Sequence, residues 1–279
     1  MLEPTLKDRN GAIMVESSTK LTWLGHNCFQ FERDGLRFIV DPFLVDGVAP
    51  RRAEEIDVDY ILVSHGHADH CQHAVAIAKR CGATIVAVAE MASYFSQQGL
   101  KTEPMNIGGA IYLPSQSSRS PKVQVLAVPA PHSSTTPSGT PGGNSMGFVL
   151  SFAQNGVDLS PSEGEIKPMK DALADANAFN AYFACDAGFF SELSWIGALG
   201  IDLAVLPIGD RYTMGPRVSL DAIAALSPKH VVPSHYNTWP PISQNADAWS
   251  AAVRKYTQAT PLVPKPGQTL QQDDSQTWR

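Results

Sequence analysis

The chain has 279 residues, of which 43% are hydrophobic and 17% charged, enough for one large or two small domains with a packed core. The formal net charge is −6, and Lys and Arg form no cluster larger than pairs such as Arg51-Arg52, which argues against nucleic-acid binding. No apolar run approaches the ~20 residues that span a bilayer, so we expect no membrane-spanning segment.

The N-terminal segment, residues 1–20, is polar and mixed in charge, with no pattern typical of a signal peptide. The four cysteines are few for this length and have no Cys-x-x-Cys spacing. Buried, reduced thiols are therefore expected, which favours a cytoplasmic location.

Short strand-like runs recur in the first half of the chain, and Asp34-Gly35 between two of them indicates a hairpin turn. The expected strands are 21–24, 28–32, 37–40, 60–63, 84–88, 103–107, 110–113 and 123–128. Apolar spacing predicts helices over 74–80 and 91–98.

The second half alternates between strands and helices after a loop rich in Ser, Thr, Pro and Gly at 133–144. Strands are expected at 146–152, 181–184, 203–206 and 230–232, and helices at 191–199, 220–226 and 246–256. A polar stretch near 155–176 interrupts this order and is interpreted as an insertion, helical near its end. Both halves thus run from strands to mixed units, which predicts an α/β fold with four layers, an αββα sandwich. Residues 21–279 would form this single domain.

The most informative segment is Ser64-His65-Gly66-His67-Ala68-Asp69-His70, directly after an expected strand. Imidazole and carboxylate are the ligands that zinc, iron and manganese accept. In an extended segment alternate residues point the same way, so His65, His67 and Asp69 would converge while His70 would point elsewhere. The segment therefore predicts two neighbouring metals, with His65 and His67 on one and Asp69 and His70 on the other.

Further candidate ligands each follow an apolar run at the end of an expected strand. They are His132, Asp186 and His235. Strand ends hold polar side chains on a rigid support, as a site at the rim of a sandwich requires. A bridging role suits Asp186, because its two oxygens can reach both ions.

These residues resemble the metallo-β-lactamase superfamily in type and order. More narrowly, the chain is similar to the uncharacterised metal-dependent hydrolases related to ascorbate-phosphate lactonase. The resemblance extends from about Leu21 to about Trp249 and includes Thr22-Trp23-Leu24-Gly25-His26, Asp41-Pro42-Phe43, Pro131-His132-Ser133-Ser134 and Pro233-Ser234-His235-Tyr236-Asn237-Thr238.

The resemblance implies the αββα sandwich and assigns the ligands. His65, His67 and His132 would hold the first metal, and Asp69, His70 and His235 the second, with Asp186 between them. Asp69 and Asp186 are the expected catalytic carboxylates. One departure is Cys185-Asp186-Ala187-Gly188, where the family usually has Gly-Asp-Thr-Gly, so a nearby hydroxyl is lost.

Neighbouring residues are candidates for orienting ligands or contacting substrate. His26 lies in an expected turn, where related proteins place a similar histidine near the site. Asp41 follows a strand and would hydrogen-bond a ligand histidine, or else form a turn before Pro42. Tyr236 would donate to a developing oxyanion, and Asp210 and Tyr212 would line the mouth.

The expected function is hydrolysis, in which a hydroxide bridging two divalent metals attacks a carbonyl or phosphoryl centre. The metals would be zinc, with manganese or iron as alternatives, and the substrate a small-molecule lactone, phosphodiester or related ester. An iron-dependent oxygenase or redox enzyme is one alternative, although di-iron relatives carry Glu where this chain has His67. An RNA-processing nuclease is another, and the acidic charge opposes it. The sequence leaves the oligomeric state open.

Overall fold

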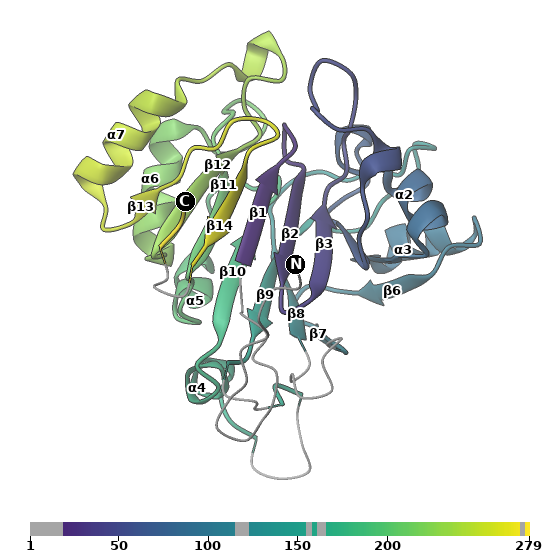
Figure 1. Cartoon of the computed structure of the whole chain (residues 1–279), viewed down its shortest axis with the longest axis horizontal. Coiled ribbons are helices and arrows are strands. Elements are labelled where there is room, and N and C mark those ends of the chain that lie inside the picture. The colour runs from purple at the N-terminus through teal and green to yellow at the C-terminus, as the bar shows by residue number, and fades with distance from the viewer. Residues whose placement is uncertain (1–18, 115–122, 155–157, 161–165, 274–276) are drawn as a thin grey trace, which may run out of the picture.

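Two β-sheets lie face to face, with helices on their outer sides (Figure 1). This arrangement is seen in a computed structural model that describes residues 19–114, 123–154, 158–160, 166–273 and 277–279. Each sheet has seven strands within these described residues. The predicted αββα sandwich is therefore confirmed.

The first sheet is antiparallel at one side and parallel at the other. In spatial order its strands are β14 (Thr269–Gln272), β1 (Thr19–Trp23), β2 (Phe29–Arg33), β3 (Leu36–Val40), β4 (Tyr60–Val63), β5 (Thr84–Val88) and β6 (Thr102–Met105). The expected hairpin at Asp34-Gly35 joins β2 to β3, with both turn residues at positive φ.

The second sheet is likewise parallel at one side and antiparallel at the other. Its strands are β13 (Thr260–Pro261), β12 (His230–Ser234), β11 (Leu203–Pro207), β10 (Phe179–Phe183), β9 (Met146–Phe152), β8 (Val123–Pro129) and β7 (Ala110–Leu113).

The helices cover the two outer faces, α2 and α3 on the first sheet and α5 to α7 on the second (Figure 1). Their bounds are α1 (Ala68–Cys71), α2 (Ala74–Cys81), α3 (Ala89–Ser96), α4 (Met169–Asp175), α5 (Leu193–Gly197), α6 (Pro216–Leu226) and α7 (Ala246–Tyr256). Two short 3-10 helices lie at Ala53–Glu55 and Pro240–Ile242.

Phenylalanine side chains hold the two sheets together. Phe31 of β2 lies 5.8 Å, between ring centroids, from both Phe152 of β9 and Phe183 of β10. All three are buried, as is every other residue of β9 and β10. Aromatic pairs at this distance add to the burial of apolar surface, so the faces of the sandwich are held in a fixed relation.

The strand directions bring several strand ends to one edge of the sandwich. In the first sheet β1, β3 and β4 run the same way, and in the second β8, β10 and β12 do. Backbone hydrogen bonds join the sheets at this edge, from His235 N to the His26 carbonyl and from Met146 N to the Ser64 carbonyl. Residues that follow these strands therefore meet, although they are far apart in sequence.

Some expectations differ from the structure or lie outside it. Strands β13 and β14 were not predicted, because a two-residue strand and a polar strand carry little apolar signal. The expected helix near the end of 155–176 is α4, whereas 155–157 and 161–165 lie outside the described residues. Residues 1–18 of the polar N-terminal segment also lie outside them.

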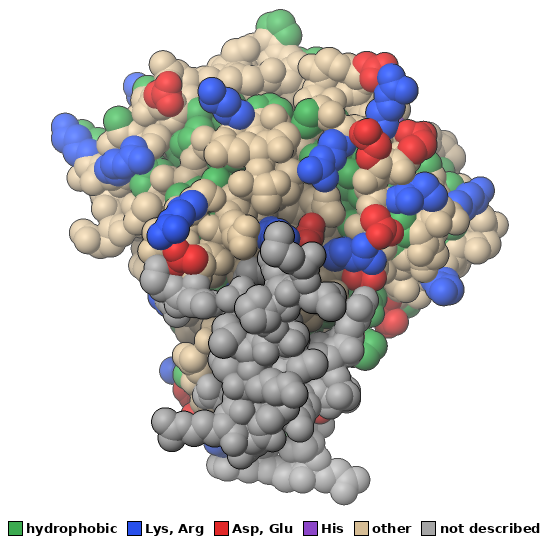
Figure 2. Space-filling model, viewed as in Figure 1, with side chains coloured by type: hydrophobic (Ala, Val, Ile, Leu, Met, Phe, Trp, Pro, Cys, Tyr) green, Lys and Arg blue, Asp and Glu red, His purple; other side chains and the backbone are tan. Residues whose placement is uncertain are grey.

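The face shown in Figure 2 carries Lys and Arg interspersed with Asp and Glu, with no dense basic patch among its coloured atoms. None of the described helices has the length and apolar character needed to cross a bilayer. All four cysteines are free, and three of them are buried.

Candidate metal centre

The His-rich segment begins where β4 ends and passes into helix α1. Gly66 is needed between its first two histidines, because a Cβ there would overlap the Thr135 carbonyl oxygen. His67 has extended backbone and is the residue before α1, which contains Asp69 and His70. The prediction of an extended segment as far as Asp69 is therefore wrong.

The helical turn also changes where His70 points. Its ring centroid lies 4.2 Å from that of His65, so the two side chains share one space. The prediction that His70 points elsewhere is wrong, because the helix begins one residue after His67 and turns His70 back toward the strand end.

Three histidines form a group that we call the outer trio: His65, His67 and His132. One ring nitrogen from each lies within 4.8 Å of the others, and His65 Nε2 is 2.9 Å from His67 Nδ1. His65 is buried, but His67 and His132 are partly exposed. The outer trio therefore borders solvent.

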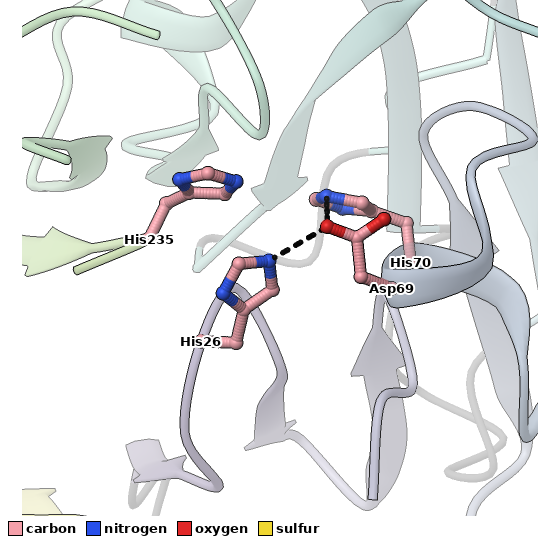
Figure 3. A group of neighbouring side chains, drawn as sticks. All are labelled: His26, Asp69, His70 and His235. Atoms are coloured by element: carbon pink, nitrogen blue, oxygen red, sulfur yellow. Dashed lines mark hydrogen bonds and ion pairs between the residues drawn. The ribbon is translucent and has the colours of Figure 1, made fainter. Parts of the chain in front are cut away.

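Four residues form a second group that we call the inner quartet: His26, Asp69, His70 and His235. They come from the β1–β2 turn, α1 and the end of β12, and their side chains point toward one another (Figure 3). His26 Nε2 lies 3.2 Å and His70 Nε2 3.7 Å from Asp69 Oδ2. The three histidines are at most 2% exposed, whereas the Asp69 side chain is 27% exposed, so this group is mostly buried.

Asp186, at the end of β10, lies between the two groups. Its Oδ2 is 3.5 Å from His132 Nε2 in the outer trio. The same oxygen is 3.2 Å from His70 Nε2 and 3.1 Å from His235 Nε2 in the inner quartet. One buried carboxylate thus contacts both groups, and the seven predicted ligands lie together at one edge of the sandwich.

Asp41, at the end of β3, fixes one histidine of each group. Its Oδ2 accepts from His70 Nδ1 at 2.8 Å and from the Ser64 hydroxyl at 2.7 Å. Because that hydroxyl has already donated its proton, its oxygen accepts from His65 Nδ1 at 2.9 Å. In both histidines the Nδ1 proton is held outside the cluster, which leaves the Nε2 lone pair directed into it.

Burial and neighbouring charges shift the pKa values of the site residues in opposite directions. Burial lowers the pKa of His65 well below its usual range, and that of His26 to about 4. Burial alone would do the same to His70, but Asp186 and Asp41 raise its pKa well above the usual range. Burial likewise would raise the pKa of Asp186, but His70 and His235 hold it well below. Without a metal, the cluster therefore keeps an ionised Asp186 beside the cationic imidazole of His70.

The backbone around the site is strained. His26, Asp41, Cys185 and His235 have φ between +45° and +54°, a conformation that L-residues rarely adopt. Non-glycine residues remain there only when the surrounding structure holds them, and such strain gathers at functional sites. The fold thus holds these side chains in place against a local energetic cost.

The donor set fits divalent metal ions. With metal–ligand distances of about 2.0–2.2 Å and ligand angles between octahedral and tetrahedral, two ligands of one ion lie roughly 2.8–3.6 Å apart. The donor distances of 2.9 Å within the outer trio and 3.1 and 3.2 Å to Asp186 lie in this range. In addition, the buried Nε2 of His70 lies 3.2 Å from Asp186 Oδ2 but makes no well-aligned hydrogen bond, as expected of a nitrogen directed at a metal.

The other predicted neighbours lie farther from the cluster. Tyr236 stacks on Trp23 with ring centroids 5.1 Å apart, and burial raises the pKa of its hydroxyl to about 12. Asp210 accepts from the Arg211 amide in its own exposed loop, and Tyr212 lies beneath the Arg211 guanidinium. The structure does not bring these side chains into the cluster, and their roles stay predictions.

Three residues of the site were missed in the sequence. Ser64 links Asp41 to His65, Asn27 donates to Asp186 Oδ1 at 3.4 Å, and the Thr238 hydroxyl lies 2.8 Å from His26 Nδ1. Each adjoins a predicted site residue or lies within three positions of one, which was the available signal. Nothing in their residue type distinguished them from ordinary turn residues.

Comparisons with known proteins identify similar sequences. A family model described as the Beta-lactamase superfamily domain matches residues 20–160. The UPF0173 metal-dependent hydrolase of Desulforamulus reducens is 37% identical over 252 residues, which cover 90% of this chain and 99% of the relative. A UPF0173 metal-dependent hydrolase of Thermus thermophilus is 36% identical over 256 residues, with 91% and 99% covered.

Solved structures show the same fold. Igni18, described as a novel metallo hydrolase from Ignicoccus hospitalis, matches with a TM-score of 0.75 at 29% identity, covering 91% of this chain and 98% of that one. An isothiocyanate hydrolase from Delia radicum gut bacteria matches with a TM-score of 0.62 at 17% identity, covering 90% and 97%. The second likeness concerns the fold alone.

Proposed function

Because the chain belongs to the β-lactamase superfamily and, within it, to the UPF0173 metal-dependent hydrolases, we propose that it is a dinuclear hydrolase of small organic esters. Lactones and phosphodiesters are the substrate classes we favour. The observation that carries the proposal is the position of Asp186, whose Oδ2 lies within 3.5 Å of His132, His70 and His235. A single carboxylate between two groups of donors is the arrangement that two neighbouring ions require.

In this proposal His65, His67 and His132 would hold the first ion. Asp69, His70 and His235 would hold the second, and Asp186 would bridge the two. Zinc suits a donor set made of imidazole nitrogens and carboxylate oxygens, and manganese and iron are alternatives. Bound ions would supply activated water at neutral pH and Lewis-acid polarisation of a carbonyl or phosphoryl group.

Hydrogen bonds from neighbouring residues fix the orientation of the proposed ligands. Asp41 and Ser64 orient His65 and His70, and Asn27 occupies the second oxygen of Asp186. The Asp186 carboxylate is thereby directed with Oδ2 toward the histidines. Outer partners of this kind fix ring orientation and raise ligand basicity.

An aromatic wall beside the inner quartet supports an organic substrate. Trp239 is 40% exposed, and its ring meets the His26 ring edge-on at 5.0 Å. Phe43 lies 6.1 Å from Trp239 between ring centroids and also contacts His26. An exposed aromatic surface next to polar donors suits the apolar part of a small ester.

The four free cysteines support a reducing, cytoplasmic location.

The test is metal quantification combined with a substrate screen. The purified protein is assayed against lactones, phosphodiesters and thioesters, before and after chelation and after adding back zinc, manganese or iron. We expect about two ions per chain and turnover that chelation removes and one of these metals restores. Turnover that survives complete metal removal would refute the proposal, and full activity with one ion per chain would refute its dinuclear form.

A further inference from the structure

Burial and backbone hydrogen bonds hold His26 in a fixed position in the β1–β2 turn. It is 1% exposed and has φ +51°. Its carbonyl accepts from the Trp23 indole and from the His235 amide, each at 3.0 Å. The turn is therefore fastened to the first sheet through Trp23 and to the second through His235.

The ring of His26 points its Nε2 into the inner quartet (Figure 3). That nitrogen lies 3.2 Å from Asp69 Oδ2, and the donor atoms of His26, Asp69, His70 and His235 all lie within 4.8 Å of one another. The His26–Asp69 distance equals the 3.2 Å between His70 and Asp186. It falls in the range of roughly 2.8–3.6 Å for two ligands of one ion.

The outer side of the ring gives an independent observation. His26 Nδ1 lies 2.8 Å from the Thr238 hydroxyl. The same pattern orients two other histidines, since Nδ1 of His65 is held by Ser64 and Nδ1 of His70 by Asp41. In the tautomer with the proton on Nδ1, the Thr238 hydroxyl accepts that proton and Nε2 presents a lone pair toward the Asp69 carboxylate. Two acceptors then face each other at 3.2 Å, and a cation between them would satisfy both.

We propose that His26 is a fourth side-chain ligand of the second metal ion, an inference that rests on the proposed dinuclear site. The second ion would then be held by His26, Asp69, His70 and His235, in addition to Asp186. The first ion would have the outer trio and Asp186. The first ion would then have one protein ligand fewer than the second, and two of its histidines are partly exposed, so substrate would bind at the outer ion.

The competing arrangement has His26 Nε2 donate a proton to Asp69. His26→Gln separates the two, because its amide N–H can still donate to a carboxylate but glutamine is a poor ligand for these metals. His73→Gln is the matched control. His73 lies near the site in sequence, yet its Nδ1 accepts from the Leu44 amide and it is outside both groups.

The readouts are calorimetric metal affinity and the visible absorption of the cobalt(II)-loaded protein. We expect His26→Gln to weaken binding of one of the two ions by at least ~10-fold and to change the cobalt spectrum, while His73→Gln changes neither. Thr238→Val, which keeps the imidazole but removes its outer partner, should weaken the same ion less. Unchanged affinity and spectrum in His26→Gln would overturn the inference.

A crystal structure of the zinc-loaded protein decides the matter independently of the variants. A distance of about 2.0–2.2 Å between His26 Nε2 and an ion establishes the ligand. Two bound ions with His26 Nε2 more than about 3 Å from either would overturn this inference and leave the proposed function intact. A wild-type chain that binds only one ion would overturn both.

Discussion

The outer trio and the inner quartet lie side by side at the same edge of the sandwich but differ in exposure. Two of the three histidines in the outer trio are partly exposed, whereas every histidine of the inner quartet is buried. Both groups contact Asp186. In the proposed dinuclear site the two ions would therefore differ in their exposure to solvent, and Asp186 would couple them.

The largest loss of metal binding and activity is expected from removing the charge of Asp186. Asp186→Asn keeps the size of the side chain but loses the charge that lies beside His70, His132 and His235. We expect the loss of at least one bound ion and a fall in kcat/KM on the order of 10³-fold or more. Metal analysis and steady-state kinetics measure this, with the exposed Asp171→Asn as control. Two ions bound normally in Asp186→Asn would show that the groups are independent.

The next effect separates the two groups. Asp41→Asn disturbs His70 directly and His65 through Ser64, whereas Ser64→Ala removes the partner of His65 and leaves the direct contact between Asp41 and His70 in place. We expect Asp41→Asn to weaken both ions by about 10–100-fold, and Ser64→Ala to weaken the outer ion alone. Calorimetric titration with zinc measures both affinities. Equal effects of the two variants would contradict the assignment of Asp41 to both groups.

Glycines beside each group offer a steric test. A Cβ on Gly66 would overlap the Thr135 carbonyl near the outer trio, and one on Gly209 would overlap the His235 carbonyl near the inner quartet. Each change to Ala should lower the free energy of unfolding by about 1–3 kcal/mol. Urea denaturation measures the loss, and Gly188→Ala provides a control, because its φ is not positive and a Cβ there meets only the Pro131 carbonyl oxygen at 3.8 Å. Stability equal to wild type in either variant would show that the backbone yields at that point.

The smallest expected effect is on the pH dependence of the stability of the metal-free protein. The pKa of His26 falls from 6.5 to about 4 because the ring is buried. Between these values the unfolded chain binds a proton that the folded chain does not, so stability falls as pH drops from about 6.5 toward 4. His26→Gln should make this dependence shallower by about 1 kcal/mol per pH unit. Urea midpoints at pH 7, 6 and 5 measure it, and parallel curves would contradict the prediction.

Much of the site was predictable because its chemistry is concentrated or its position is marked. The motif from His65 to His70 carries four donors in six residues, and His132, Asp186 and His235 each follow an apolar strand. The direction of His70 was not predictable from alternation, because a four-residue helix has too few residues to show a helical period.

The supporting residues were harder to predict for a different reason. Ser64 and Thr238 act only through the histidine that each contacts, so their role exists in the folded arrangement and not in their own sequence pattern. Strand β14 could not be recognised either, because it is polar and becomes a strand by pairing with β1. The layers of the fold, in contrast, follow from apolar periodicity and were predicted in the correct order.

The ligands come from both sheets, which has a consequence for the unfolded chain. An ion held by His70 and His235 would connect positions separated by ~165 residues, and one held by His65 and His132 would close a loop of ~67. Cross-links that close long loops remove more conformational entropy from the unfolded ensemble than those that close short ones, although the gain grows only as the logarithm of loop length. Metal binding would therefore also act as a reversible cross-link between the two halves of the chain.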